Sequence, residues 1–208
     1  MPSLLDLRRR IRSVKNTQQI TKAMKMVAAA KLRRAQDRVV AARPYATSLQ
    51  QMLANVASAG SGSDAVARLP LLQVRPKKKI LVLLVTADRG LAGAFNANII
   101  KGAQKFVDEN RGLAIQMECI GRKGRDYFKR RDSVEVTGEH IGILGNVTVA
   151  AAKAIAEKAI RSYENAEVDA VYLVYNEFKS VIAQKLVVSQ VLPVALEETG
   201  PAKGDYLY

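Results

Sequence analysis

The sequence predicts an α/β protein in which a long N-terminal coiled-coil helix precedes a Rossmann-like domain with a mainly parallel sheet. The first observation behind this prediction is a heptad pattern of apolar residues that runs without a break through residues 4–56. The second is an alternation of strand-length apolar runs with helical patterns after residue 78. With 208 residues, 49% of them hydrophobic and 25% charged, the chain has room for one ordinary domain and an extension.

The N-terminal segment repeats its apolar positions at alternating intervals of three and four residues, which is the spacing of a coiled-coil seam. The seam positions are Leu4, Leu7, Ile11, Val14, Gln18, Thr21, Lys25, Ala28, Leu32, Ala35, Val39, Ala42, Ala46, Leu49, Leu53 and Val56. Thirteen of the sixteen are apolar, and the polar stretch 18–25 indicates a zone that contacts something other than a partner helix. Such a helix would be about 80 Å long. No later helical pattern is longer than 148–163, so we expect the covering helix to come from another copy, a partner protein or residues beyond 208.

Two features mark the course of this helix. Ser3 is a plausible N-cap, and Asp6 stands three residues later, as in a capping box. Pro44 should bend the helix, because proline removes a backbone hydrogen bond and clashes with the preceding turn. The seam resumes in phase at Ala46, so we expect a kink at Pro44 and not an end.

The remainder of the chain reads as alternating strands and helices. The expected strands are 79–86, 114–120, 134–137, 170–176 and 182–191, the last of them an edge strand ended by Pro193. The expected helices are 92–107, 122–131 and 148–163. This alternation is typical of a mainly parallel sheet covered by helices on both faces. The predicted division is therefore 1–57 for the shaft helix, 58–76 for a linker, 77–195 for the α/β domain and 196–208 for a tail.

The net charge of +14 predicts an acidic partner, which could be nucleic acid, an anionic membrane surface or an acidic protein face. Most of the charge lies in residues 1–45, where twelve cations oppose only Asp6 and Asp37. The cations are Arg8, Arg9, Arg10, Arg12, Lys15, Lys22, Lys25, Lys31, Arg33, Arg34, Arg38 and Arg43. Single-stranded nucleic acid is usually bound with stacking aromatics, and Tyr45 is the only aromatic residue in the first 57, so an acidic protein surface fits better.

The most enzyme-like segment is 86–96, a glycine-containing loop placed where α/β proteins bind phosphates. It lacks the glycine spacing of a dinucleotide site and the Gly-Lys-Ser/Thr ending of a P-loop. The favoured interpretation is a tight turn at Gly90 and Gly93, with Asp88 or Asn96 capping backbone amides. A nucleotide-binding enzyme that uses Asp88 remains an alternative.

Other candidates for chemistry are few. One cysteine, Cys119, excludes an internal disulfide and is expected to be an inert buried thiol. The single His140 excludes a cluster of His and Cys metal ligands and is expected in a loop. We therefore assign no catalytic, cofactor-binding or metal-ligating residue. No run of about 18 apolar residues suggests a membrane span.

Four segments carry a resemblance to a known family. Residues 11–31 (Ile-Arg-Ser-Val-Lys-Asn-Thr-Gln-Gln-Ile-Thr-Lys-Ala-Met-Lys-Met-Val-Ala-Ala-Ala-Lys) resemble the N-terminal signature of the gamma subunits of rotary ATP synthases. The loop 88–96 and the segments 175–180 and 190–193 are similar to later parts of the same family. The resemblance implies that the N-terminal helix pairs with a long C-terminal helix to form a shaft inside a ring of alpha and beta subunits. It also implies that the α/β domain lies at the foot, with epsilon, on the c ring.

The function implied by the resemblance is that of a non-catalytic rotor subunit, since ATP is made on beta. It would couple proton flow to ATP synthesis and regulate ATPase activity, as a peripheral protein on the cytoplasmic side of the bacterial plasma membrane. The residues implied to contact beta are Lys22, Met24, Lys25, Lys31, Arg33 and Arg34, and those implied to meet the c ring and epsilon are Tyr206 and Tyr208. The family continues past Tyr208 into its C-terminal helix, where this chain stops. The alternative function is a basic coiled-coil nucleic-acid-binding protein.

Overall fold

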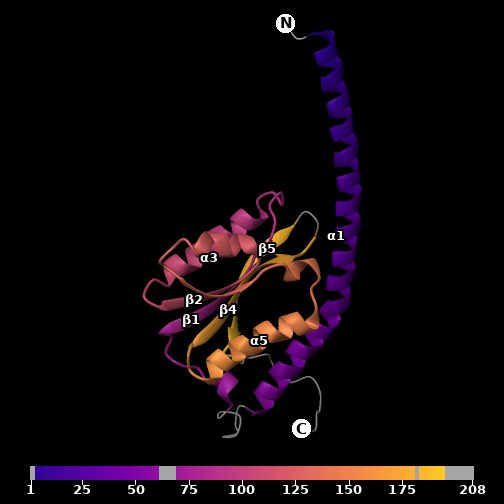
Figure 1. The fold of residues 1–208 in the computed structure, drawn as a ribbon. Coiled ribbons are helices and arrows are strands. Elements are labelled where there is room, and N and C mark those ends of the chain that lie inside the picture. Colours follow the sequence, from indigo (N-terminus) through magenta and orange to yellow (C-terminus); the bar gives the residue numbers. More distant parts are fainter. Residues whose placement is uncertain (1–2, 61–68, 181–182, 195–208) are drawn as a thin grey trace. The chain divides into compact units, whose positions relative to one another are not determined.

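The computed structural model describes residues 3–60, 69–180 and 183–194, and the chain divides into two compact units. The first contains helix α1 (Leu4–Gly60) as far as Val56, and the 57 residues of the whole helix give a length of about 85 Å. The Ser3 hydroxyl accepts a hydrogen bond from the Asp6 amide at 3.3 Å, and the Ser3 amide donates to the Asp6 carboxylate at 3.3 Å, so the predicted capping pair is confirmed. Pro44 lies inside the helix, which continues past it and bends toward its C-terminal end (Figure 1).

The second unit is built on a five-stranded sheet with the order β3-β2-β1-β4-β5. The strands are β1 (Lys79–Val85), β2 (Ala114–Ile120), β3 (Glu135–His140), β4 (Ala170–Phe178) and β5 (Gln184–Leu192). The first four are parallel and β5 pairs with β4 in the antiparallel sense, so the expected mainly parallel sheet and its final edge strand are both confirmed. The helices are α3 (Phe95–Glu109), α4 (Arg122–Phe128) and α5 (Val149–Glu164), with short 3-10 turns η1 (Pro70–Leu72) and η2 (Ile143–Gly145).

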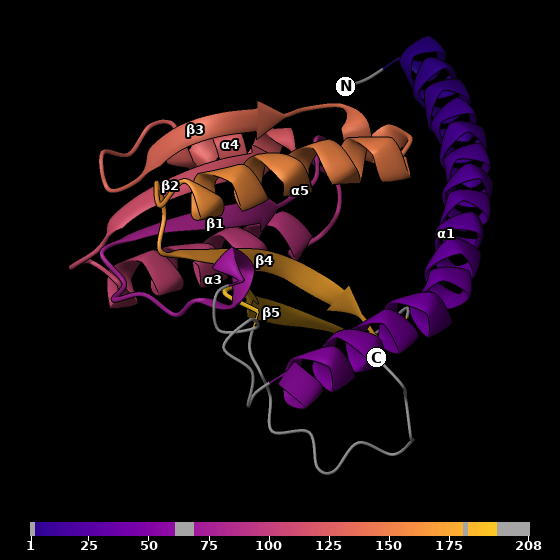
Figure 2. The same ribbon diagram turned by 90° about the horizontal axis from the view of Figure 1, so that it is seen from below.

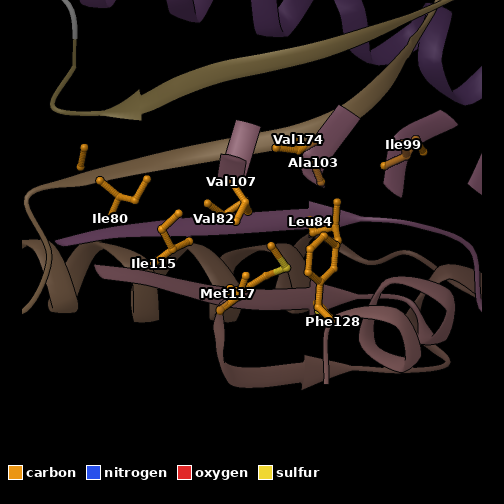
Figure 3. Packing of buried hydrophobic residues seen from close by; sticks show 13 residues of the cluster. Ile80, Val82, Leu84, Ile99, Ala103, Val107, Ile115, Met117, Phe128 and Val174 are labelled. Atoms are coloured by element: carbon orange, nitrogen blue, oxygen red, sulfur yellow. The ribbon is translucent and has the colours of Figure 1, made fainter. Parts of the chain in front are cut away.

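Helices cover both faces of this sheet, as Figure 2 shows for α3 and α5. On one face, α3 and α4 pack on the side chains of alternate strand residues (Figure 3). The buried residues of that cluster include Ile80, Val82, Leu84, Ile99, Ala103, Val107, Met117 and Phe128. On the other face, α5 packs through Ile155, Ala159 and Tyr163 on the strand residues that point the opposite way, including Leu81, Leu83 and Val171. Because both faces are buried, the central strand β1 is apolar at six of its seven positions rather than alternating.

Several predicted boundaries differ from the observed ones for local reasons. The helix expected from residue 92 begins at Phe95, because Leu91 (φ 61°) and Gly93 (φ 54°) adopt left-handed conformations that no helix contains. The helix expected over 122–131 ends at Phe128, and the strand expected over 134–137 runs on to His140. The prediction that His140 lies in a loop is therefore wrong.

The region predicted as a linker is partly described. Helix α1 extends to Gly60, and η1 occupies Pro70–Leu72 before the first strand. Residues 61–68 and the predicted tail 196–208 lie outside the described residues. None of the described helices is both long and apolar enough to cross a lipid bilayer.

Candidate interaction surfaces

The seam of α1 is uncovered. All of its large apolar side chains up to Leu53 are exposed, with exposed fractions between 41% and 77%. The longest described helix of the second unit is α5, with 16 residues against 57 in α1. Among the described residues there is therefore no helix of the length needed to cover the seam. An exposed apolar stripe of this length is typical of a surface that a partner covers.

The cations of α1 that the sequence singled out lie on the same exposed helix. Lys22, Lys25, Lys31, Arg33 and Arg34 are all exposed, and none of them forms a salt bridge with any described carboxylate. At about 100° per residue they point to all sides of the helix. The helix is thus a positively charged cylinder, not a helix with one charged stripe, and such a surface favours a partner that surrounds it.

Two further residues of this part of α1, Met24 and Thr21, lie outside any core of the described chain. Met24 is 59% exposed, so its side chain does not belong to a core of the described chain. The hydroxyl of Thr21 donates to the carbonyl oxygens of Thr17 and Gln18 at 2.9 Å, so the polar part of the seam satisfies its hydroxyl within the helix. Tyr206 and Tyr208 lie outside the described residues.

The loop 87–94 follows β1 at the carboxyl edge of the parallel strands. Asp88 binds the first residue of α4 and the residue before η2, because its Oδ1 accepts from the Arg122 amide and its Oδ2 from the Gly142 amide, both at 3.0 Å. Asn96 holds the loop itself, accepting from the Ala87 amide at 2.9 Å. The predicted capping role of Asp88 and Asn96 is therefore confirmed, and the N-terminus of α4 is occupied by a carboxylate of the chain.

Close backbone packing explains the glycines that follow β2. Gly121 has φ +104°, and an added Cβ there would lie 2.1 Å from the Thr86 carbonyl oxygen. The hydroxyl of Thr86 accepts from the Gly124 amide at 2.9 Å, which joins the end of β1 to the start of α4. The basic segment 121–125 is therefore built around the chain's own contacts.

A buried charge cluster lies under α5, where sequence reasoning did not place one. The Glu118 side chain is only 1% exposed, and its two oxygens lie 2.5 Å from Lys158 Nζ and 3.0 Å from His140 Nε2. A register shift between Met117 and Glu118 places Gly138 opposite Glu118. The signal in the sequence was a glutamate inside an otherwise apolar strand, but its partners are 22 and 40 positions away.

Cys119 is the free, buried thiol that the sequence predicted. Burial raises the pKa of this thiol to about 12. Within the described residues there is no group of three or more His, Cys, Asp or Glu side chains that could hold a metal ion.

Comparison with known proteins gives consistent matches. A family model described as ATP synthase matches residues 3–208. The ATP synthase gamma chain of Solibacter usitatus is 58% identical, over 100% of this chain and 72% of that protein, and the one of Chlorobaculum parvum is 50% identical with the same two coverages. A chain in the central stalk and c-ring of the Tetrahymena thermophila mitochondrial ATP synthase is 32% identical, with a TM-score of 0.64 over 84% of this chain and 72% of that one. A rotor chain of the Euglena gracilis mitochondrial ATP synthase, 19% identical with a TM-score of 0.58, shares the fold.

Proposed function

Because this chain belongs to the ATP synthase gamma-chain family and is a rotor subunit of that complex, we propose that α1 is one helix of a central shaft turning against the alpha and beta subunits. The observation that carries the proposal is the exposed seam of α1 together with Lys22, Lys25, Lys31, Arg33 and Arg34, which point to all sides of the helix and form no salt bridge with a described carboxylate. A second long helix would cover the seam, and acidic segments of beta would face the cations.

The proposed beta-contact residues are Lys22, Met24, Lys25, Lys31, Arg33 and Arg34. The lysines and arginines among them are exposed and have no salt bridge to a described carboxylate, so within the described chain no ion pair has to be broken before they bind an acidic partner. The proposed foot contacts are Tyr206 and Tyr208, which would meet the c ring and epsilon. The proposed partners are thus alpha, beta, epsilon and the c ring, and not nucleic acid.

In this function the chain transmits torque and carries out no bond chemistry of its own. Proton flow turns the ring, the α/β domain takes up the torque, and the asymmetric shaft drives the three beta sites through different nucleotide affinities. The coupling between ring and nucleotide sites is then a mechanical coupling free energy. The chain would lie on the cytoplasmic side of the plasma membrane, where the other subunits of the complex hold it.

A reconstitution experiment tests the proposal. Complexes of alpha, beta and this chain in its full natural length would be compared with complexes that lack it, and ATPase turnover would be measured. If the ATPase assembles and cycles equally well without the chain, the proposed shaft role is wrong.

Charge reversal then tests the contact residues. Arg33→Glu with Arg34→Glu should lower ATPase turnover by at least about tenfold, because like charges would face each other across the contact. The control is Lys153→Glu, a single charge reversal on α5 at a side chain that is 72% exposed. Equal effects of the two changes would contradict the contact assignment while leaving the shaft role standing.

A further inference from the structure

The amino edge of the parallel strands, opposite the Asp88 loop, contains a cleft of about 450 Å³. It lies between the end of α3, the turn before β2 and the turn before β3. Its lining residues are Gln104, Val107, Asp108, Arg111, Leu113, Ile115, Arg131 and Ser133. A volume of this size falls within the range of about 300–1,000 Å³ that is usual for small-molecule sites.

Two guanidinium groups line this cleft, and each is held in place by a contact that leaves donors unused. Arg131 lies over the Tyr127 ring at 3.5 Å and donates one Nη1 hydrogen bond to the Tyr127 carbonyl oxygen at 2.9 Å. Arg111 donates through Nε and Nη2 to Asp108 Oδ1, at 3.3 and 2.9 Å. A guanidinium has five N–H donors, so each arginine keeps at least three for a ligand. Held side chains bind an anion at a lower entropic cost than free ones.

The charge of the surroundings favours an anion. The turns before β2 and β3 carry four cations, Arg111, Lys129, Arg130 and Arg131, all of them exposed. In the segments 108–111 and 129–133 these cations stand against Asp108, Glu109 and Asp132, which leaves an excess of one positive charge. Ser133 adds a hydroxyl donor at the rim of the cleft.

The opposite wall of the cleft is apolar. Val107 and Ile115 are buried, and Leu113 packs partly buried against the same core. A bare inorganic ion would leave this apolar wall without a contact, whereas a phosphate ester could place its carbon body there. The cleft therefore suits a ligand with a phosphate group at one end and carbon atoms at the other.

We propose that this cleft binds the phosphate group of an organic phosphate ester, with Arg111 and Arg131 as the phosphate ligands and Ser133 as a third donor. Two sources share this chemistry, a soluble phosphate ester and the headgroup of an anionic phospholipid. All the residues of the site belong to the second unit and none to α1, so the proposal does not depend on the shaft role.

Titration calorimetry with the whole 208-residue chain tests the proposal, with sn-glycerol 3-phosphate and inorganic phosphate as soluble probes. Flotation with phosphatidylcholine vesicles, with and without phosphatidylglycerol, forms the lipid arm. If the ligand is a soluble ester, we expect saturable binding of glycerol 3-phosphate that is tighter than the binding of inorganic phosphate. If the ligand is a lipid headgroup, we expect binding to the vesicles that contain phosphatidylglycerol and no saturable binding of glycerol 3-phosphate. Saturable binding in neither arm would overturn the proposal.

Three variants distinguish a site from diffuse charge. Arg131→Gln should weaken binding at least about tenfold, because it removes a charge-assisted contact. Ser133→Asp should do the same by placing a carboxylate at an exposed position that the fold tolerates. Arg130→Gln removes an equal charge from the neighbouring residue, whose side chain does not line the cleft. It should weaken binding less than about threefold. If Arg130→Gln weakens binding as much as Arg131→Gln, the attraction is diffuse and the site assignment is wrong.

Discussion

Glu118 on β2 and Lys158 on α5 meet at 2.5 Å across β3, at the point where Gly138 has no side chain. The Glu118 carboxylate is buried, and Lys158 reaches it from a side chain that is 46% exposed. Lys158 also donates to the Thr137 carbonyl oxygen at 3.4 Å, next to the register shift in the strand pair. The Lys158 side chain therefore joins α5 to β2 through an ion pair and to β3 through a hydrogen bond.

Gly138→Ala should destabilise the α/β domain. A Cβ at this position would lie 3.0 Å from both Glu118 Cδ and Lys158 Nζ, so the pair would have to shift apart and leave a buried carboxylate less well compensated. We expect the free energy of unfolding to fall by about 1–3 kcal/mol, measured by chemical denaturation. Gly145→Ala is the control, because an added Cβ there meets nothing within 4 Å. Equal losses in the two variants would show that the gap over Glu118 is not what Gly138 provides.

Asp88→Ala should loosen the carboxyl edge of the sheet. The change removes the acceptor of the Arg122 and Gly142 amides, so both should exchange with solvent faster. Hydrogen exchange measured by mass spectrometry on the segments 121–125 and 141–145 checks this. Asp126→Ala is the control. It removes a carboxylate of α4 that accepts from the Arg125 side chain and from neither of these two amides, so both segments should stay protected. Unchanged protection in Asp88→Ala would contradict the bridging role.

Cys119 should resist alkylation while the domain is folded. Burial raises its thiol pKa to about 12, so both access and thiolate formation oppose reaction with iodoacetamide at pH 8. Labelling followed by mass spectrometry should show almost no modification in the native chain and complete modification in guanidinium chloride. Rapid labelling of the native chain would show that β2 opens far more often than a core strand does.

Asp169 should contribute to acid sensitivity. Hydrogen bonds from the Lys79 and Lys78 amides lower the pKa of its carboxyl below the ordinary value of 3.8. A lowered folded-state pKa adds stability above the ordinary value, and that stability is lost as the pH falls through the folded-state pKa. Unfolding midpoints measured from pH 5 downward should fall less steeply in Asp169→Asn than in the parent chain. The control Asp132→Asn leaves the Lys78 and Lys79 amides bound to Asp169, so its unfolding midpoint should fall with pH as steeply as that of the parent chain. Identical slopes in all three proteins would contradict the contribution of Asp169 to acid sensitivity.

The sequence was most informative where a periodic pattern extended over many residues. The seam of α1 and the apolar run of β1 each repeat a local rule, so the long helix and the buried strand could be predicted from the sequence. Residues 92–94 were predicted as helix, but Gly93 has a positive φ there, and the pattern of apolar residues does not show a backbone conformation of this kind. The Glu118–Lys158 pair was missed because it depends on a strand irregularity and a glycine far away in the chain.

Single-molecule rotation tests the central assignment most directly. The chain in its full natural length, carrying Lys153→Cys as an accessible labelling position on α5, would be assembled with surface-fixed alpha and beta subunits and given a bead at that cysteine. Since Cys119 is buried, the label should attach to one place. The shaft assignment predicts stepwise rotation in one direction when ATP is added, and slower stepping in Arg33→Glu with Arg34→Glu. A bead that stays fixed while the same complexes hydrolyse ATP at full rate would contradict it.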